Sequence, residues 1–235
     1  MGAEPLRIGV VGAAGRLGSR IVAECQRQGI PVPFAAIRNH WPMTCDVDVV
    51  IDASRGEVLP RTAELCHRSA AALVVCASDL TDDAPALLAD LARRVAVVRA
   101  VNLSVGHWMQ CHLLTVAGRI AARLPGQSQL SVLERHPPRK VDRPSASATT
   151  IAANWTAVTG RPVAEVASYR AGLAVCEHRA DLSLEHETLT LHHDVRSLDA
   201  AVFGALLAAS WAREAPPGLV SVAELFNHAF LQEVR

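Results

Sequence analysis

A polar stretch at residues 134–147 holds the side chains best suited to proton transfer. It reads Glu-Arg-His-Pro-Pro-Arg-Lys-Val-Asp-Arg-Pro-Ser-Ala-Ser and lies between an expected strand and an expected helix. His136 and Lys140 are candidate acids that could deliver a proton after a hydride has been accepted. Ser145 and Ser147, with the free amides of the helix start, suit a substrate carboxylate. On composition alone, a basic surface loop is the simpler interpretation.

A second group of residues could bind phosphate. Residues 8–18 read Ile-Gly-Val-Val-Gly-Ala-Ala-Gly-Arg-Leu-Gly and place a Gly-rich turn between the first expected strand and its helix. Glycines let the backbone of such a turn approach a pyrophosphate, whose charge the helix N-terminus stabilises. The position favours a dinucleotide site over a plain strand-to-helix turn. The expected contacts are Gly12, Ala14, Gly15, Arg16, Leu17 and Gly18.

The end of the second expected strand bears on the choice of dinucleotide. An NAD-selective protein normally places an acid there to bind the ribose 2′-hydroxyl, whereas this chain reads Ala-Ile-Arg-Asn over residues 36–39. The guanidinium of Arg38 could pair with a 2′-phosphate, with Arg16 as a second contact. We therefore favour NADPH over NADH, the alternative being that Arg38 is a solvated surface residue.

Short β-rich runs alternate with helical stretches through the first part of the chain. Such alternation is typical of βαβ units and predicts an α/β fold with a doubly wound, Rossmann-type parallel sheet. The expected strands span residues 6–11, 32–37, 47–51, 72–76 and 95–98, and the expected helices span 17–28, 57–69 and 82–93.

The rest of the chain predicts a second domain of α+β type, because its strands are longer, alternating and more polar. We expect strands at 129–134, 165–170, 174–182 and 187–195, and helices at 105–124, 145–159, 198–214 and 221–226. Ser145 is the expected N-cap of its helix. The expected domains are a dinucleotide-binding domain (1–104), a substrate-binding and oligomerisation domain (105–214) and a C-terminal segment (215–235), for which a return to the first domain is one option.

Composition excludes several classes of function. Lys and Arg (23) balance Asp and Glu (23), and aromatic residues make up 4% of the 235 residues. A basic field or a base-stacking surface for nucleic acid is therefore not expected. No apolar run approaches the roughly 20 residues of a membrane span, and no signal-peptide layout is present. These features favour a soluble cytoplasmic protein.

The cysteine and histidine spacing does not predict a metal site. The cysteines contain no CxxC pair, and reduced thiols are the simplest interpretation. His107 with Cys111, and His192 with His193, offer too few ligands at any recognised spacing. The six cysteines are Cys25, Cys45, Cys66, Cys76, Cys111 and Cys176.

Several segments together resemble the dihydrodipicolinate reductase family of the lysine pathway. Residues 134–147 resemble its E-x-H-H-x-x-K-x-D-x-P-S-G-T signature, residues 12–18 its G-A-x-G-R-M-G turn, and residues 100–106 its A-x-N-F-S-V-G segment. Residues 49–54 are similar to its strand ending in D-F-T, and residues 170–178 to its R-x-G…G-E-H. The resemblance implies a Rossmann domain, a substrate domain that builds a homotetramer, and reduction of a cyclic imine dicarboxylate with NADH or NADPH.

The resemblance also implies roles for individual residues. His136 and Lys140 match the catalytic pair, and Ser145, Ala146 and Ser147 match the carboxylate site. Ser54 and Asn102 match residues around the nicotinamide. Cys76 and Ser78 stand where the family has the G-T-T-G loop beside the nicotinamide, and this position makes them expected cofactor contacts.

Departures from the family pattern concentrate in the substrate pocket. Pro137 and Pro138 replace a histidine and a basic residue, Ala146 replaces a glycine, and Asp79 stands where it could repel a carboxylate. Losing several donors together favours a reductase acting on a cyclic imine or conjugated unsaturated amino-acid-derived carboxylate with fewer carboxylates. An authentic lysine-pathway reductase and an inactive cofactor-binding homologue are the alternatives.

Overall fold

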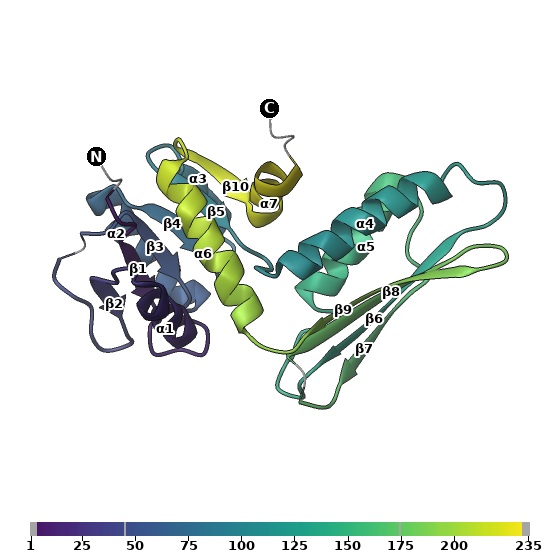
Figure 1. Cartoon of the computed structure of the whole chain (residues 1–235), viewed down its shortest axis with the longest axis horizontal. Helices are drawn as coiled ribbons and strands as arrows, with labels where there is room; N and C mark the ends of the chain where they lie inside the picture. Colours follow the sequence, from purple (N-terminus) through teal and green to yellow (C-terminus); the bar gives the residue numbers. More distant parts are fainter. Residues whose placement is uncertain (1–3, 45, 174, 232–235) are drawn as a thin grey trace. The chain divides into compact units, whose positions relative to one another are not determined.

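The structure is a computed structural model that describes residues 4–44, 46–173 and 175–231. Cys45, Ala174 (the first residue of an expected strand) and the end of the segment 215–235 therefore lie outside the described residues. The chain forms two compact units, drawn together in Figure 1. Unit 1 comprises residues up to Leu103 together with those from Asp199 onward, and unit 2 comprises Ser104–Leu198.

Unit 1 is built on a parallel sheet, which confirms the predicted Rossmann-type class. Its described strands run in the order β10-β5-β4-β3-β1-β2. β1, β3 and β4 are buried along their whole length, as expected for a parallel sheet covered on both faces. The strands are β1 (Ile8–Val11), β2 (Phe34–Ala36), β3 (Val49–Asp52), β4 (Ala72–Val75), β5 (Ala96–Arg99) and β10 (Gly218–Ser221).

Helices pack against this sheet through small and branched apolar residues. α1 (Gly18–Gln28) ends at Gly29, whose left-handed backbone (φ 69°) suits a glycine C-cap. A short 3₁₀ turn, η1 (Gly56–Val58), leads into α2 (Leu59–Ser69). α2 and α3 (Ala84–Leu91) share one apolar cluster with β3, β4 and β5. These elements place the turns after β1, β2 and β3 at one edge of the sheet.

The C-terminal elements differ from the sequence-based division. The helix expected at 198–214, assigned to the second domain, is α6 (Asp199–Glu214), which packs on β3, β4, β5 and α1 of unit 1. Gly204 allows this approach, because a Cβ there would lie 1.9 Å from the carbonyl oxygen of Leu103. β10 was not expected; it pairs in parallel with β5 and is followed by α7 (Val222–Leu231).

Unit 2 is a mixed sheet covered on one face by two helices, as the predicted α+β class requires. The strand order is β7-β6-β8-β9, with β7 (Glu165–Arg170) parallel to β6 (Gln129–His136), and β8 (Cys176–Ser183) and β9 (Thr188–Val195) antiparallel. α4 (Val105–Ala121) and α5 (Ala146–Thr159) bury Leu114, Ile151 and Trp155 against β6 and β8. The carboxyl ends of β6 and β7 and the start of β8 thereby lie side by side near the start of α5.

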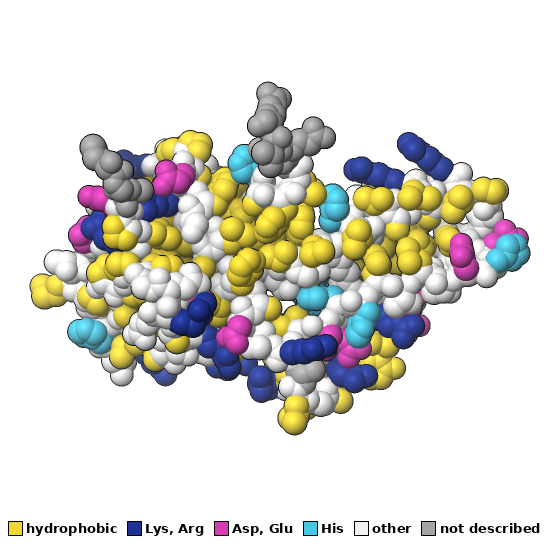
Figure 2. Space-filling view, in the orientation of Figure 1, with side chains coloured by type: hydrophobic (Ala, Val, Ile, Leu, Met, Phe, Trp, Pro, Cys, Tyr) yellow, Lys and Arg dark blue, Asp and Glu magenta, His cyan; other side chains and the backbone are white. Residues whose placement is uncertain are grey.

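One face of α4 is both apolar and exposed. Met109, Leu113, Val116 and Ile120 recur at helical spacing and each is at least 42% exposed. Figure 2 shows hydrophobic side chains gathered along this helix. The described helices nevertheless include none with the length and apolar content needed to span a bilayer.

Candidate active site

A cavity of about 570 Å³ in unit 1 opens where β1, β2 and β3 end. Its size is within the range of small-molecule sites, and carboxyl ends of parallel strands are where α/β sheets bind ligands. Of the sequence-predicted cofactor residues, it brings together Gly12, Ala14, Gly15, Arg38 and Ser54. It does not include Arg16, Leu17, Gly18, Cys76, Ser78 or Asn102.

The turn after β1 depends on glycine for close backbone contact. Gly12 has a left-handed backbone (φ +79°), and a Cβ there would lie 2.8 Å from the carbonyl oxygen of Ala53. A Cβ on Gly18 would lie 2.1 Å from the carbonyl oxygen of Gly12. Gly12 therefore packs the turn against the loop after β3, and Gly18 packs the start of α1 against the turn.

Two residues that sequence reasoning missed complete the cavity wall. Trp41 follows β2, and Arg61 of α2 lays its guanidinium 3.9 Å from the Trp41 ring centre, while Phe34 packs edge-on to the same indole. Arg38 and Arg61 thus line the same cavity and make this part of its wall cationic. Local sequence could not predict this pairing, because Arg61 lies 23 residues beyond Arg38 in another element.

The loop after β3 is fixed by two carboxylates. Asp52 is fully buried and accepts hydrogen bonds from the amide of Ser54, at 2.9 Å, and from its hydroxyl. Burial raises the pKa of Asp52 despite these bonds. The amide of Gly56 donates to Asp79 Oδ1 at 2.9 Å, and Arg55 lies 3.7 Å from the same carboxylate. Asp79, which we expected to repel a carboxylate, thus positions the loop that carries Ser54.

The other predicted nicotinamide contacts follow β4 and β5. Cys76 extends the ladder, since its amide donates to the carbonyl of Asp52 at 2.9 Å, and burial raises the pKa of its thiol. Ser78 is exposed and Asn102 is half-buried. All three lie at the carboxyl-terminal edge of the unit 1 sheet, outside the cavity lining.

Unit 2 holds a buried carboxylate at the end of β6. Glu134 is fully buried, and its Oε1 accepts from Arg170 Nη2 at 2.8 Å and Ser168 Oγ at 2.7 Å. The amide of Ser145 donates to both carboxylate oxygens at 3.1 Å. Burial opposes ionisation, yet these donors and the neighbouring His136 outweigh it and hold the pKa of Glu134 well below its usual range. Glu134 is therefore a fixed negative charge inside the unit.

The two candidate acids are attached to this carboxylate. His136 is 5% exposed, and its Nε2 lies 3.3 Å from Glu134 Oε2. Lys140 is reached through a turn in which its amide donates to the carbonyl of Pro137, and its Nζ lies 2.8 Å from Asp142. Arg170 donates to the carbonyl oxygens of Lys140 and Asp142 as well as to Glu134. One buried guanidinium thus connects the loop of Lys140 to the partner of His136.

Part of the predicted carboxylate site at the start of α5 already forms hydrogen bonds within the chain. Ser145 is the N-cap, as predicted, and its buried hydroxyl accepts from the amide of Ala148 at 3.2 Å. Its amide is used by Glu134. Ala146 is exposed and Ser147 half-buried in the first turn. Ser145 therefore positions the helix start.

Comparison with known proteins gives consistent matches over both units. Two family models match, "Dihydrodipicolinate reductase, N-terminus" at residues 31–103 and "Dihydrodipicolinate reductase, C-terminus" at residues 111–226. The 4-hydroxy-tetrahydrodipicolinate reductase of Anaeromyxobacter dehalogenans is 30% identical over 243 residues, covering 94% of this chain and 88% of that protein. The 4-hydroxy-tetrahydrodipicolinate reductase of Myxococcus xanthus is 32% identical over 198 residues, covering 77% of this chain and 72% of that protein.

A solved structure shares the fold at low identity. The dipicolinate-bound dihydrodipicolinate reductase of Paenisporosarcina sp. TG-14 superimposes with a TM-score of 0.72 at 16% identity, covering 92% of this chain and 97% of that one. The sequence matches confirm the predicted family and enzyme class, an oxidoreductase that uses a nicotinamide cofactor. On these matches, the chain belongs to the dihydrodipicolinate reductase family.

Proposed function

We propose that the chain uses NADPH to reduce the C=N or conjugated C=C bond of a cyclic, amino-acid-derived carboxylate that carries fewer carboxylates than the substrate of its relatives. NADPH, when bound, supplies the hydride. The chain supplies the proton, for which His136 and Lys140 are the candidate donors. The observation that carries this proposal is the buried Glu134, held by Arg170 and Ser168, with His136 Nε2 3.3 Å away.

The geometry supports His136 as the proton donor. Its ring lies against a carboxylate that stays ionised, so a protonated imidazole at this position has a counter-charge. Lys140 is about one-third exposed and paired with Asp142, which suits a cation that contacts substrate from the loop. We propose that His136 delivers the proton, and that Lys140 binds the substrate anion or assists the proton transfer from His136.

A reduced number of substrate carboxylates fits the start of α5. Pro137 and Pro138 bring neither a side-chain donor nor a backbone N–H to the loop, and Ala146 adds a methyl group at the helix N-terminus. The amide of Ser145 already donates to Glu134, so it is not free to bind a substrate carboxylate. Each hydrogen bond lost to a charged group costs about 1.5–3 kcal/mol. A substrate with one carboxylate fewer avoids this cost.

Comparing two substrate classes tests the proposal. With NADPH in excess, kcat/KM is measured for 4-hydroxy-tetrahydrodipicolinate and for five- and six-membered cyclic imines that carry a single carboxylate. We expect a monocarboxylate to be preferred by about tenfold or more, the effect of one lost charged hydrogen bond. Preference for the dicarboxylate would instead identify an authentic lysine-pathway reductase. Failure of calorimetry to detect binding of either NADPH or NADH would leave only the inactive homologue.

Replacing Arg38 by aspartate tests the cofactor preference. Because a guanidinium pairs with the 2′-phosphate and an acid repels it, we expect Arg38→Asp to raise the Kd of NADPH about 10–100-fold and to change that of NADH little. Arg68→Asp, a charge reversal at an exposed arginine of α2 outside the cavity, is the matched control and should affect neither. Equal weakening of both cofactors by Arg38→Asp would contradict the assignment.

Self-association is part of the same proposal. The family resemblance implies a homotetramer built by the sheet of the substrate domain, and the exposed apolar stripe of α4 (Met109, Leu113, Val116 and Ile120) is a further surface that a second copy of the chain could cover.

A further inference from the structure

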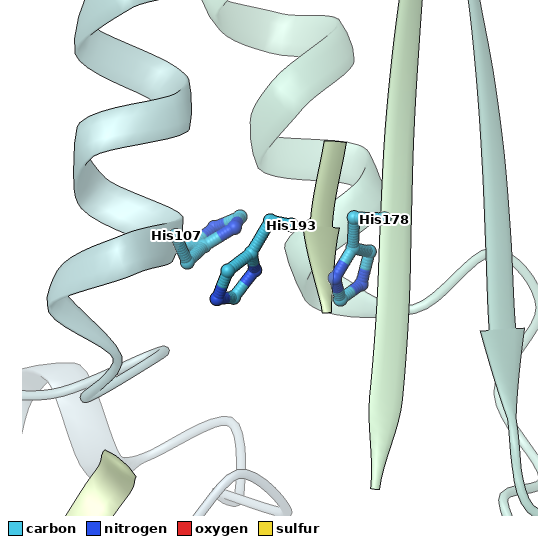
Figure 3. Close-up of side chains that lie close together, drawn as sticks. All are labelled: His107, His178 and His193. Carbon is cyan, nitrogen blue, oxygen red and sulfur yellow. The ribbon is translucent and has the colours of Figure 1, made fainter. Parts of the chain in front are cut away.

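Three histidines from three elements of unit 2 lie together beside α4. His107 belongs to the first turn of α4, and His178 and His193 are directly paired across β8 and β9. The imidazoles of His178 and His193 are stacked with centres 6.2 Å apart, and the His107 ring lies 5.7 Å and 6.2 Å from them. One ring nitrogen of each lies within 4.8 Å of the others. Figure 3 shows the three side chains gathered between helix and sheet.

The hydrogen bonds of these rings leave nitrogens available. Nε2 of His193 lies 3.1 Å from Ser104 Oγ, and Nε2 of His107 lies 3.7 Å from Cys111 Sγ. Nδ1 of His107, Nδ1 of His193 and both nitrogens of His178 are buried without a hydrogen-bond partner in the described part of the chain. His107 is 5% exposed and His178 is fully buried. Unpaired buried polar atoms are costly, so several in one place call for a ligand.

The charge state of the rings suits a metal rather than an anion. Burial lowers the pKa of His107 and of His178. The nitrogens without a hydrogen-bond partner are the atoms that can bind a metal ion, since a neutral imidazole carries a lone pair on one ring nitrogen.

The surrounding structure holds the rings in place. Gln110 Nε2 donates to the carbonyl oxygens of His178 and Leu191, at 2.9 Å each, and so ties α4 to β8 and β9. A Cβ at position 106 would lie 2.9 Å from the His193 ring, so Gly106 leaves the room that this ring occupies. The cluster is thus supported by the fold on both the helix and the sheet side.

We propose that His107, His178 and His193 form a three-histidine site for a divalent transition metal of the Zn²⁺ type, with water in the fourth position. Zn–N bonds of about 2.0–2.1 Å require nitrogens roughly 3.3 Å apart, so small ring movements close the site. Each ligand has a neighbour that can orient it from outside, namely Ser104 for His193, Cys111 for His107 and, at 4.0 Å, Glu134 for His178. The absence of a metal motif along the chain does not oppose this, because the three positions meet only in the folded unit.

Metal titration of the full chain tests the site. After chelator treatment and removal of the chelator, we expect calorimetry to detect one Zn²⁺ per chain and Co²⁺ to give the visible absorption of a tetrahedral site. Zn²⁺ should also raise the thermal unfolding midpoint. His107→Leu and His193→Asn should each weaken Zn²⁺ binding by more than the roughly 10–100-fold typical of outer-shell changes.

Two histidine variants in the same unit serve as matched controls. His186 is exposed, and His192 lies next to His193 but pairs with Glu177 at 3.2 Å on the exposed side of β9. His186→Ala and His192→Gln should leave Zn²⁺ binding unchanged. Circular dichroism checks that each variant is folded. If His107→Leu does not fold, His193→Asn provides the test, because His193 is only half-buried. The proposal is overturned if Zn²⁺ does not bind, or if folded His107→Leu and His193→Asn bind it as tightly as the unchanged chain.

Discussion

The variant His136→Asn is expected to lose about 10²–10⁴-fold in kcat, the usual contribution of a positioned general acid. The ring it removes is 5% exposed and lies 3.3 Å from Glu134 Oε2, closer to that oxygen than the buried His178 ring at 4.0 Å. Because the Gly12 turn and Arg38 belong to the other unit, the Kd of NADPH should change little. Steady-state kinetics and calorimetry on the folded variant measure both quantities.

Two further variants test whether the loss of kcat is specific to His136. Lys140→Gln is expected to raise KM more than it lowers kcat if Lys140 binds the substrate anion, which separates its role from that of His136. His186→Ala, at an exposed histidine of the same unit, should retain full activity. Unchanged kcat in His136→Asn would show that another group donates the proton, and the proposed role of His136 would fall.

Arg170→Ala is expected to lower the free energy of unfolding by about 3–5 kcal/mol, the cost of leaving a buried charge without its partner. The Arg170 side chain is 2% exposed and its partner Glu134 fully buried, at 2.8 Å. The same substitution also releases the carbonyls of Lys140 and Asp142, so activity should fall with stability. Urea unfolding at neutral pH gives the change in free energy.

Arg179→Ala is the matched control, because Arg179 is 48% exposed and forms a pair with Asp181 at 2.9 Å in the same sheet. Exposed pairs contribute about 0–1 kcal/mol, so its effect should be small. The double variant Glu134→Gln, Arg170→Met should lose less than the sum of its single variants, since neither charge is then left alone. Equal losses for Arg170→Ala and Arg179→Ala would contradict the buried-pair account.

Local sequence was enough to predict the elements that carry the cofactor turn and the acid loop. Gly12 to Gly18 follow β1 because an apolar strand, a glycine turn and an amphipathic helix are each encoded within a few residues. Ser145 was identified as an N-cap for the same reason, since the cap bonds to the amide three residues further on. The strand at 165–170 was predicted with its observed bounds.

Local sequence was not enough for elements that depend on a distant partner. β10 has only four residues and is a strand because it pairs with β5, more than 100 residues earlier. α6 is an Ala-rich helix whose pattern shows that it packs but not on which sheet, and the structure places it on β3, β4 and β5 of unit 1. A periodic pattern of apolar residues predicts that one face of a helix is buried, but it does not predict which element covers that face.

The sequence by itself was enough to identify the family and the two kinds of sheet, and to select His136, Lys140 and Gly12 as candidates, because the motifs that hold these residues are short and contiguous. Only the tertiary structure decided that Arg61 and Trp41 join Arg38 at one cavity, and that Arg170 neutralises Glu134 behind His136. It also decided that His107, His178 and His193 converge. The physical reason is common to all three: cation stacking, a buried ion pair and metal coordination act over a few ångströms in space, and sheet pairing and helix packing set those distances between residues far apart in the chain.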